Sequence, residues 1–247
     1  MKYGTFCSKR GEQLAYQFVV GASPTVVFLN GFRSDMRGGK STFVRQFCVE
    51  HGLAFATLDY SGHGLSGGDF LNGTVSAWKA DAEALIELVN PASVVYVGAS
   101  MGAWIGALLA KKSPVPVKAL IGIGTSICFA DELFRRLSAI EAAQLEADGL
   151  TFVASAYGDG PYPITRGLLD DAQSLSELGG GFDLTCPIRL IHGLDDPDVP
   201  WARTIEYTNA FSSRDVRVSL IKGGGHRLSS PRALEHLRQT LREVLAF

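Results

Sequence analysis

Short apolar runs, several of them rich in β-branched residues, recur along the chain, and segments with helical periodicity separate them. Six of these runs predict strands, at residues 25–29, 54–58, 94–97, 119–123, 188–191 and 216–221. Several lack strict alternation of polar and apolar residues, which is typical of strands buried on both faces of a parallel sheet. Because right-handed crossovers join such strands, the pattern predicts an α/β fold with a mostly parallel central sheet flanked by helices.

The two ends of the chain carry clear local signals. Residues 3–20 contain two β-prone pieces around a Lys-Arg-Gly turn at residues 9–11, which predicts an antiparallel hairpin at the edge of the sheet. Near the C-terminus, Ser230 can cap a helix whose first residue is Pro231. Leucines recur at three- to four-residue spacing through residues 234–245, so this segment is predicted to be the last helix.

One long segment interrupts the alternation. About sixty residues with no convincing strand separate the strands predicted at 119–123 and 188–191, which is too long for a plain connection. Apolar residues at helical spacing, beginning at Phe129 and Leu133, indicate helices in this segment. We therefore expect a helical cap at residues 125–185, inserted in a single domain that spans residues 1–247.

Composition excludes several classes of function. A formal net charge of −2 gives no overall field that would recruit nucleic acid or an anionic membrane. No apolar run approaches the roughly 18 residues that a bilayer span needs, which predicts no integral membrane segment. The four cysteines stand singly, without a C-x-x-C pair, so we expect no metal site.

The strongest motif is Gly98-Ala99-Ser100-Met101-Gly102, which has the form G-x-S-x-G. It follows the strand predicted at 94–97 and precedes a helix of small and apolar residues. A strained strand-to-helix turn lifts a serine hydroxyl clear of the sheet, and the flanking glycines relieve the crowding that this turn causes. The context therefore predicts that Ser100 is a catalytic nucleophile.

A serine nucleophile needs a general base, because its hydroxyl is protonated at neutral pH. Three histidines follow Ser100 in the sequence. His192 ends a strand and His236 lies inside the last helix, whereas His226 follows three glycines in the loop between the last strand and the last helix. A base must reach the serine from a loop at the carboxyl edge of the sheet, so His226 is the predicted base. The other two are interpreted as a packed strand-end residue and a solvated helix residue.

The carboxylate that orients the base should follow the strand predicted at 188–191. That loop offers Asp195, Asp196 and Asp198. The pattern H-G-x-x-D-x-x-V-P favours Asp196, and the other two are then solvated charges or turn formers. The three compete within one turn, and Asp196 is the preferred assignment.

The sequence Gly-Gly-Lys-Ser at residues 38–41 raises a competing reading, because such a loop between a strand and a helix can cradle phosphate. A Walker A loop needs glycine where this chain has Ser34, so we expect no nucleotide site at Lys40. A serine hydrolase gives the same loop another role. It would supply the backbone N–H of Phe32 to the tetrahedral oxyanion, while Met101 supplies the second N–H.

Five segments together resemble the α/β-hydrolase superfamily and, within it, the group of mitochondrial palmitoyl-protein thioesterases that also cleave acyl glucuronides. They are LNGFRSDMRGGKS, LDYSGHGLSGG, VGASMGAW, PIRLIHGLDDPDVPW and GGGHRLS. The resemblance implies that Ser100, Asp196 and His226 are nucleophile, acid and base. It also implies that Asp59 and the glycines near His63 shape a turn beside the oxyanion loop, with His63 structural.

The resemblance has two departures. The first residues, MKYGTFCSKRGEQ, lack the presequence of the mitochondrial group, which favours a bacterial, cytoplasmic member. The oxyanion loop reads Asn30-Gly31-Phe32, where this group usually has Pro-Gly, but a backbone donor tolerates that change.

These observations predict a cofactor-free hydrolase of small-molecule or acylated esters and thioesters, in which Phe129, Leu133 and Phe134 of the cap contact the acyl group. The same fold and triad support perhydrolysis or C–C bond hydrolysis, because fold does not fix function. A non-enzymatic receptor for small ligands is the third alternative. The sequence does not indicate an oligomeric state.

Overall fold

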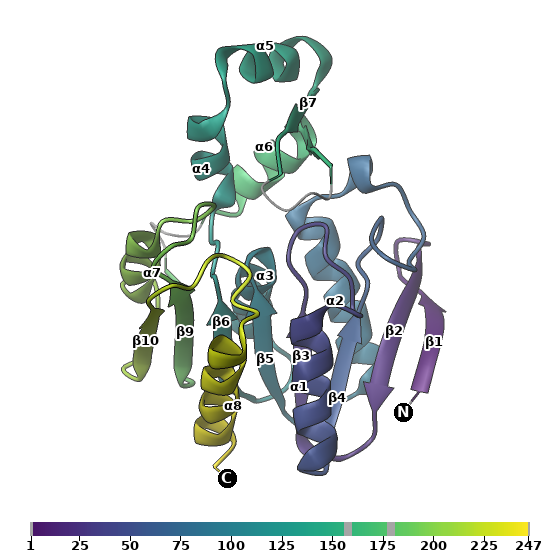
Figure 1. Cartoon of the computed structure of the whole chain (residues 1–247). Helices are drawn as coiled ribbons and strands as arrows, with labels where there is room; N and C mark the ends of the chain where they lie inside the picture. The colour runs from purple at the N-terminus through teal and green to yellow at the C-terminus, as the bar shows by residue number, and fades with distance from the viewer. Residues whose placement is uncertain (1, 156–159, 177–180, 247) are drawn as a thin grey trace.

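The structure is a computed structural model that describes residues 2–155, 160–176 and 181–246, apart from the side chains of residues 131, 132 and 135. Eight strands form one sheet in the order β1-β2-β4-β3-β5-β6-β9-β10 (Figure 1). Their bounds are Lys2–Cys7, Gln13–Val19, Ala22–Leu29, Leu53–Leu58, Val94–Ala99, Val117–Ile123, Ile188–Gly193 and Val216–Ile221 for β1, β2, β3, β4, β5, β6, β9 and β10. The pairs β1–β2 and β2–β4 are antiparallel and the others are parallel, which confirms the predicted mostly parallel sheet.

Local sequence signals at the two ends are also confirmed. The strands β1 and β2 form the antiparallel hairpin at one edge, with Gly11 in the left-handed region at a φ of 86°. At the other end, Ser230 caps α8 (Pro231–Leu245) by accepting a hydrogen bond from the Ala233 N–H. These features depend on neighbouring residues alone, because a turn glycine and a helix cap need no tertiary partner.

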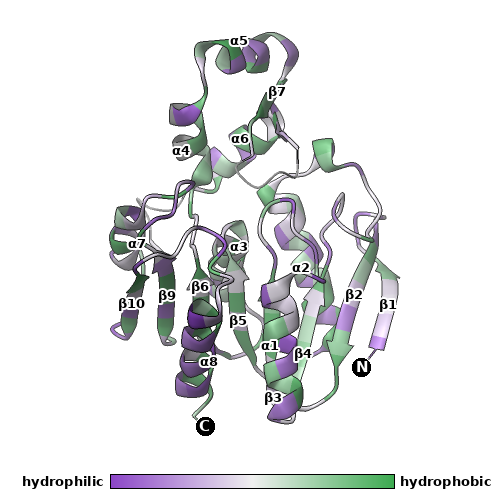
Figure 2. Ribbon diagram, viewed as in Figure 1, coloured by the Kyte–Doolittle hydropathy of each residue, from purple (hydrophilic) through white to green (hydrophobic). Residues whose placement is uncertain are grey.

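Helices cover both faces of the sheet. Two of them, α1 (Gly39–Glu50) and α8, pack on one face around Phe47, Phe55 and Leu241. Three others pack on the opposite face, where Trp78 and Trp104 are fully buried. They are α2 (Val75–Val89), α3 (Met101–Lys111) and α7 (Trp201–Thr208). Figure 2 shows the apolar central strands and the polar outer side of α8.

We call residues 125–185 the cap, and its helices and strands lie beyond the carboxyl ends of the parallel strands (Figure 1). These elements are α4 (Phe129–Arg136), α5 (Ala139–Asp148), β7 (Leu150–Val153), β8 (Tyr162–Thr165) and α6 (Arg166–Ser174). The expectation of no strand in this segment is wrong, because β7 and β8 pair as an antiparallel ribbon. Each strand has only four residues and β8 contains Pro163, which weakens the strand signal in the sequence.

The carboxyl edge of the sheet gathers the loops that carry the predicted site. Loops follow β3, β4, β9 and β10 at this edge, and β5 leads directly into Ser100 and α3. A short 3₁₀ helix, η1 (Phe70–Asn72), closes the loop after β4. Because parallel strands end at the same edge, residues far apart in the sequence meet beneath the cap.

Candidate active site

Ser100 occupies the sharp turn between β5 and α3. Its φ of 52° and ψ of −121° are unusual for a residue other than glycine, and such strain is found at functional sites. A side chain at position 98 would overlap the backbone of Gly102 and Ala103, and one at position 102 would overlap the Leu29 carbonyl oxygen. The glycines of the motif are therefore required by close backbone packing.

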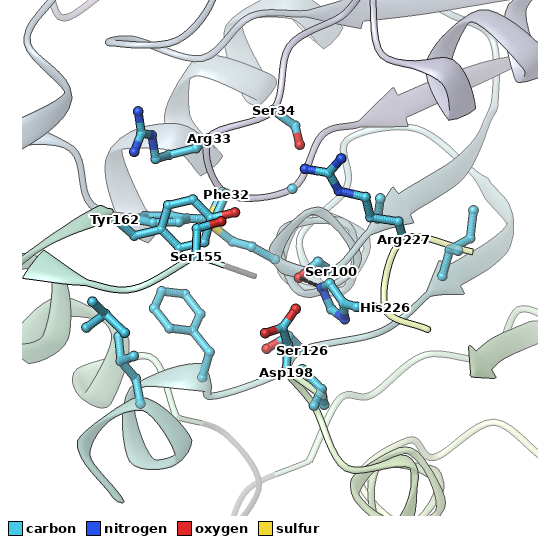
Figure 3. Close-up of a pocket in the computed structure, with 18 of the residues that line it drawn as sticks. Phe32, Arg33, Ser34, Ser100, Ser126, Ser155, Tyr162, Asp198, His226 and Arg227 are labelled. Carbon is cyan, nitrogen blue, oxygen red and sulfur yellow. Dashed lines mark hydrogen bonds between the residues drawn. The ribbon is translucent and has the colours of Figure 1, made fainter. Parts of the chain in front are cut away.

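The structure brings Ser100, His226 and Asp196 together in one hydrogen-bonded line (Figure 3 labels Ser100 and His226). The distance between Ser100 Oγ and His226 Nε2 is 3.0 Å, and that between His226 Nδ1 and Asp196 Oδ2 is 2.8 Å. Because a carboxylate only accepts, Nδ1 carries the proton that it donates to Asp196. His226 Nε2 is then left to accept the serine hydroxyl, as a general base requires.

The Asp196 side chain is fully buried and its two oxygens are both engaged. Oδ1 accepts the backbone N–H groups of Asp198 and Val199, and Oδ2 lies 2.9 Å from His192 Nε2 as well as near His226. Burial alone would raise the pKa of this carboxyl group, but the hydrogen bonds from His192 and His226 outweigh burial and hold it well below its usual range. Asp196 is therefore a carboxylate across the physiological pH range.

The other two aspartates of this loop differ from each other. Asp195 is exposed, as expected for a solvated charge. Asp198 is half-buried and lines the cavity near His226, so it is less solvated than expected. Its carboxylate lies 3.6 Å from the Arg136 guanidinium, and Arg136 also donates to the Asp198 carbonyl oxygen at 2.8 Å. Packing of the cap over the loop encloses this side chain.

Neither of the other two downstream histidines reaches Ser100 directly. His192 is fully buried at the end of β9, where Nδ1 lies 2.6 Å from the Thr204 hydroxyl and Nε2 lies near Asp196. The packed strand-end reading was therefore correct, although His192 also supports the acid. His236 is half-buried on α8 with its Nε2 enclosed, so it is less solvated than expected.

The two residues predicted to supply the oxyanion donors lie beside Ser100. Gly31 packs against the nucleophile, since a Cβ at this position would lie 3.3 Å from Ser100 Cβ and 3.2 Å from the Ala99 carbonyl oxygen. The next residue, Phe32, and Met101 at the start of α3 both line the cavity. Within residues 2–155, 160–176 and 181–246, neither amide has a hydrogen-bond acceptor. Both N–H groups are therefore available to an oxyanion.

A cavity of about 220 Å³ extends from Ser100 beneath the cap. Its apolar side includes Phe32, Phe129, Leu133, Val153, Tyr162 and Ile164. The predicted cap residues Phe129 and Leu133 thus line the same cavity as the nucleophile. The assignment of Phe134 to the acyl site is wrong, because it does not line the cavity and its ring lies 6.0 Å from the Arg166 guanidinium carbon. Successive side chains of an α-helix point about 100° apart, so Phe134 is directed toward α6 whereas Leu133 lines the cavity.

Another part of the cavity carries two basic side chains, those of Lys40 and Arg227. Figure 3 shows Arg227 and Tyr162 on opposite sides of Ser100. Lys40 also lines this part, and its ammonium donates to the Arg227 carbonyl oxygen at 2.6 Å. Burial and the nearby Arg227 guanidinium lower the pKa of Lys40 to about 8. The sequence does not indicate that Lys40 lies beside Ser100, because only the fold joins the start of α1 to the loop that carries His226.

One group of side chains in the described residues has the spacing of a metal site. Potential ligand atoms of Asp196, Asp198 and His226 lie within 4.8 Å of one another. However, His226 Nδ1–H already donates to Asp196, and Asp196 Oδ2 accepts from a second imidazole. A metal at this position would have to displace the hydrogen bonds that align Ser100 and His226, so the donor set fits a hydrogen-bond network better than a metal centre.

The sheet topology and the strained serine turn define a serine hydrolase of the α/β class. A family model described as serine aminopeptidase, S33, matches residues 22–155, which is more than half of the chain. The chain therefore belongs to this family of α/β-hydrolases. In the part of the chain that the structure describes, no helix has both the length and the apolar character needed to cross a membrane.

The alignments with similar proteins extend over most of the chain. The mitochondrial palmitoyl-protein thioesterase ABHD10 of Mus musculus is 33% identical over 94% of this chain and 78% of its own length. The solved structure of α/β-hydrolase domain-containing protein 10 from mouse has a TM-score of 0.92 and 30% identity, with 100% of this chain and 99% of that chain covered. A protein from Agrobacterium vitis S4 has a TM-score of 0.94 and 30% identity, with 98% of each chain covered.

Proposed function

We propose that this protein hydrolyses carboxylic esters or thioesters through an acyl-enzyme on Ser100. The observation that carries the proposal is the continuous line from Ser100 Oγ to His226 and Asp196, which opens into a cavity with an apolar side. A serine that donates to a base, itself oriented by a carboxylate, is the arrangement needed for acyl transfer. The relatives named thioesterases support the same class of reaction.

The geometry suits both halves of the reaction. His226 Nε2 takes the proton of Ser100 as Oγ bonds to the substrate carbonyl carbon, and the Phe32 and Met101 amides stabilise the resulting oxyanion. His226 then gives that proton to the leaving alcohol or thiol as the acyl–oxygen or acyl–sulfur bond breaks. Water repeats the attack on the acyl-enzyme and regenerates Ser100. Asp196 holds the imidazole and stabilises its cation in both halves, and the steps require neither metal nor organic cofactor.

The cavity and the relatives favour an apolar acyl group. Phe129, Leu133 and Ile164 of the cap give the acyl group a surface without charge. The mouse and human relatives are named palmitoyl-protein thioesterases, which supports thioesters of fatty acids as substrates. Those relatives are also named as mitochondrial, and a cytoplasmic location for this chain stays a prediction.

A second candidate is an acyl ester whose leaving group is an anion, such as an acyl glucuronide. Lys40 and Arg227 lie across Ser100 from the apolar wall, where the leaving group would sit if the acyl chain occupies the cap. Within the residues that the structure describes, Lys40 forms no ion pair, so its ammonium can bind a carboxylate. Partial burial strengthens such an interaction relative to one in bulk water.

The test uses p-nitrophenyl butyrate with the protein and its Ser100→Ala variant. We expect a burst of nitrophenolate equal to the enzyme concentration, and a loss of kcat of about 10⁴-fold or more in the variant, because nucleophile and base act as a unit. Mass spectrometry should find the acyl group on Ser100. Binding of an ester without turnover would favour the receptor alternative. Peroxide-dependent halogenation or cleavage of a diketone, with little esterase activity, would favour perhydrolysis or C–C hydrolysis.

A further inference from the structure

Hydrogen bonds to the end of β4 and to the loop that follows it hold both ends of the loop after β3. At its start, the Asn30 side-chain amide donates to the Leu58 carbonyl oxygen at 2.9 Å. At its end, the Met36 N–H donates to Asp59 Oδ1 at 2.6 Å. Both contacts are buried, so they hold the two ends of the oxyanion loop against the sheet.

The middle of the same loop has a different support, which is His63. The Arg33 N–H, in the peptide group directly after Phe32, donates to His63 Nε2 at 3.3 Å. On the other side of the ring, His63 Nδ1 lies 3.2 Å from the Ser61 carbonyl oxygen. A carbonyl only accepts and a backbone N–H only donates, so His63 must carry its proton on Nδ1 and present a lone pair at Nε2.

Aromatic rings prevent the imidazole from turning away. The rings of Tyr60, Phe70 and Trp78 lie 5.0 to 5.7 Å from its centre. Ser61 is itself fixed, because its N–H and hydroxyl both donate to the buried Asp81 carboxylate at 2.8 and 2.7 Å. Burial lowers the pKa of His63 to about 4, so the neutral form that can accept persists at physiological pH.

Arg33 needs this support. Its φ of 53° lies in the left-handed region, where residues with a side chain are rarely stable without an external contact. Because the Arg33 N–H belongs to the peptide group that follows Phe32, its direction restricts the orientation of the Phe32 amide. We propose that His63 is a positioning residue for acyl transfer, which holds the Phe32 N–H toward the oxyanion by accepting the Arg33 N–H. This inference rests on the proposed function, in which Phe32 is an oxyanion donor.

The experiment compares His63→Phe, which keeps a ring but loses the acceptor, with His63→Gln, whose amide oxygen can replace Nε2. Leu65→Ala is the control, because Leu65 lies in the same loop as His63 and is 60% exposed. For His63→Phe we expect kcat for p-nitrophenyl butyrate to fall about 10²-fold at similar KM, as for loss of one oxyanion donor. The inhibition constant of an alkyl trifluoromethyl ketone, whose adduct with serine is an oxyanion, should rise by about the same factor.

His63→Gln should recover about tenfold of the lost kcat, and Leu65→Ala should stay within about threefold of the parent. Thermal unfolding of each variant separates loss of stability from loss of positioning. Wild-type kcat and ketone affinity in folded His63→Phe would overturn the inference while leaving the proposed function intact. Full activity in Ser100→Ala would instead overturn the proposed function.

A measurement on the unaltered protein covers the case in which His63→Phe does not fold. Nitrogen-15 NMR of the imidazole rings, assigned with His63→Gln, should show His63 protonated at Nδ1 and unprotonated at Nε2. A proton on Nε2 would exclude acceptance from Arg33 and would overturn the inference.

Discussion

The loops after β3, β4 and β9 are fastened by hydrogen bonds between buried groups, whereas the cap above them packs mainly through apolar side chains. Asp59 illustrates the first region, since its two oxygens accept the N–H groups of Met36 and Leu65. Ile164 and Leu168 illustrate the second, since both have apolar side chains that are buried in the cap.

This difference corresponds to two tasks. Acyl transfer needs donors and acceptors fixed in direction, and buried hydrogen bonds supply that. Acyl selectivity needs apolar area and shape, which side chains of about the right size can provide in several arrangements. Substitutions of the buried hydrogen-bonding groups in the loops should therefore lower kcat for every substrate, and substitutions in the cap should change the ranking of substrates.

The largest effect should come from the acid. Asp196→Asn should lower kcat for p-nitrophenyl butyrate by about 10⁴-fold, because an amide in this place can donate to His226 and reverse its tautomer. Asp198→Asn and the exposed control Asp195→Asn should stay within about threefold. Steady-state kinetics on the three purified variants checks this. A greater loss in Asp198→Asn than in Asp196→Asn would show that the acid is assigned wrongly.

A smaller effect, confined to selectivity, is expected in the cap. Across p-nitrophenyl esters, kcat/KM should rise from acetyl to about octanoyl, because each buried methylene contributes up to about 0.8 kcal/mol. Phe129→Ala should lower the octanoyl value about tenfold and change the acetyl value little. Phe134→Ala, whose ring faces α6, is the matched control. A preference for acetate that Phe129→Ala leaves unchanged would show that the cap does not bind the acyl chain.

Lys40 should give a still smaller effect that depends on pH. Its pKa of about 8 means that the ammonium loses its charge as pH rises through 8. The ratio of kcat/KM for an acyl glucuronide to that for its uncharged methyl ester should therefore fall about two- to fivefold between pH 7 and pH 9. In Lys40→Met the ratio should be low at both pH values. An equal ratio in the parent and the variant at pH 7 would exclude Lys40 from leaving-group binding.

For nucleotide binding we expect no effect at all. Equilibrium dialysis with ATP and Mg²⁺ at millimolar concentration should detect no saturable binding, because Ser34 replaces the first glycine of a Walker A loop. Binding that Lys40→Ala abolished would reinstate the phosphate reading of residues 38–41.

The same contrast explains what could be predicted from the sequence. The turn at Ser100 was predictable because Gly98 and Gly102 are both forced by backbone contacts, so chemistry and local packing act on the same five residues. The loop positions of His226 and the preferred acid followed from the order of the strands. Local patterns of this kind predict structure well, because few other local structures are compatible with them.

The features that the sequence did not reveal depend on how elements pack. Leu133 and Phe134 are neighbours on α4 with similar apolar character, and only the position of α6 determines which of them faces the cavity. Asp198 is enclosed by Arg136 from the cap, and His63 meets Arg33 across a separation of 30 residues. Periodicity within one element contains no information on such partners.

The cap leaves the sheet after β6 and returns at β9, and these two strands are hydrogen-bonded neighbours. Any segment inserted there begins and ends one strand apart, and doubling the length of a flexible insertion costs only about 0.6 kcal/mol in chain entropy. Insertions of different length and composition can therefore be exchanged at this point without altering the register of the sheet or the turn at Ser100. In protein engineering, this junction is the natural graft point for giving one hydrolytic centre a new range of substrates.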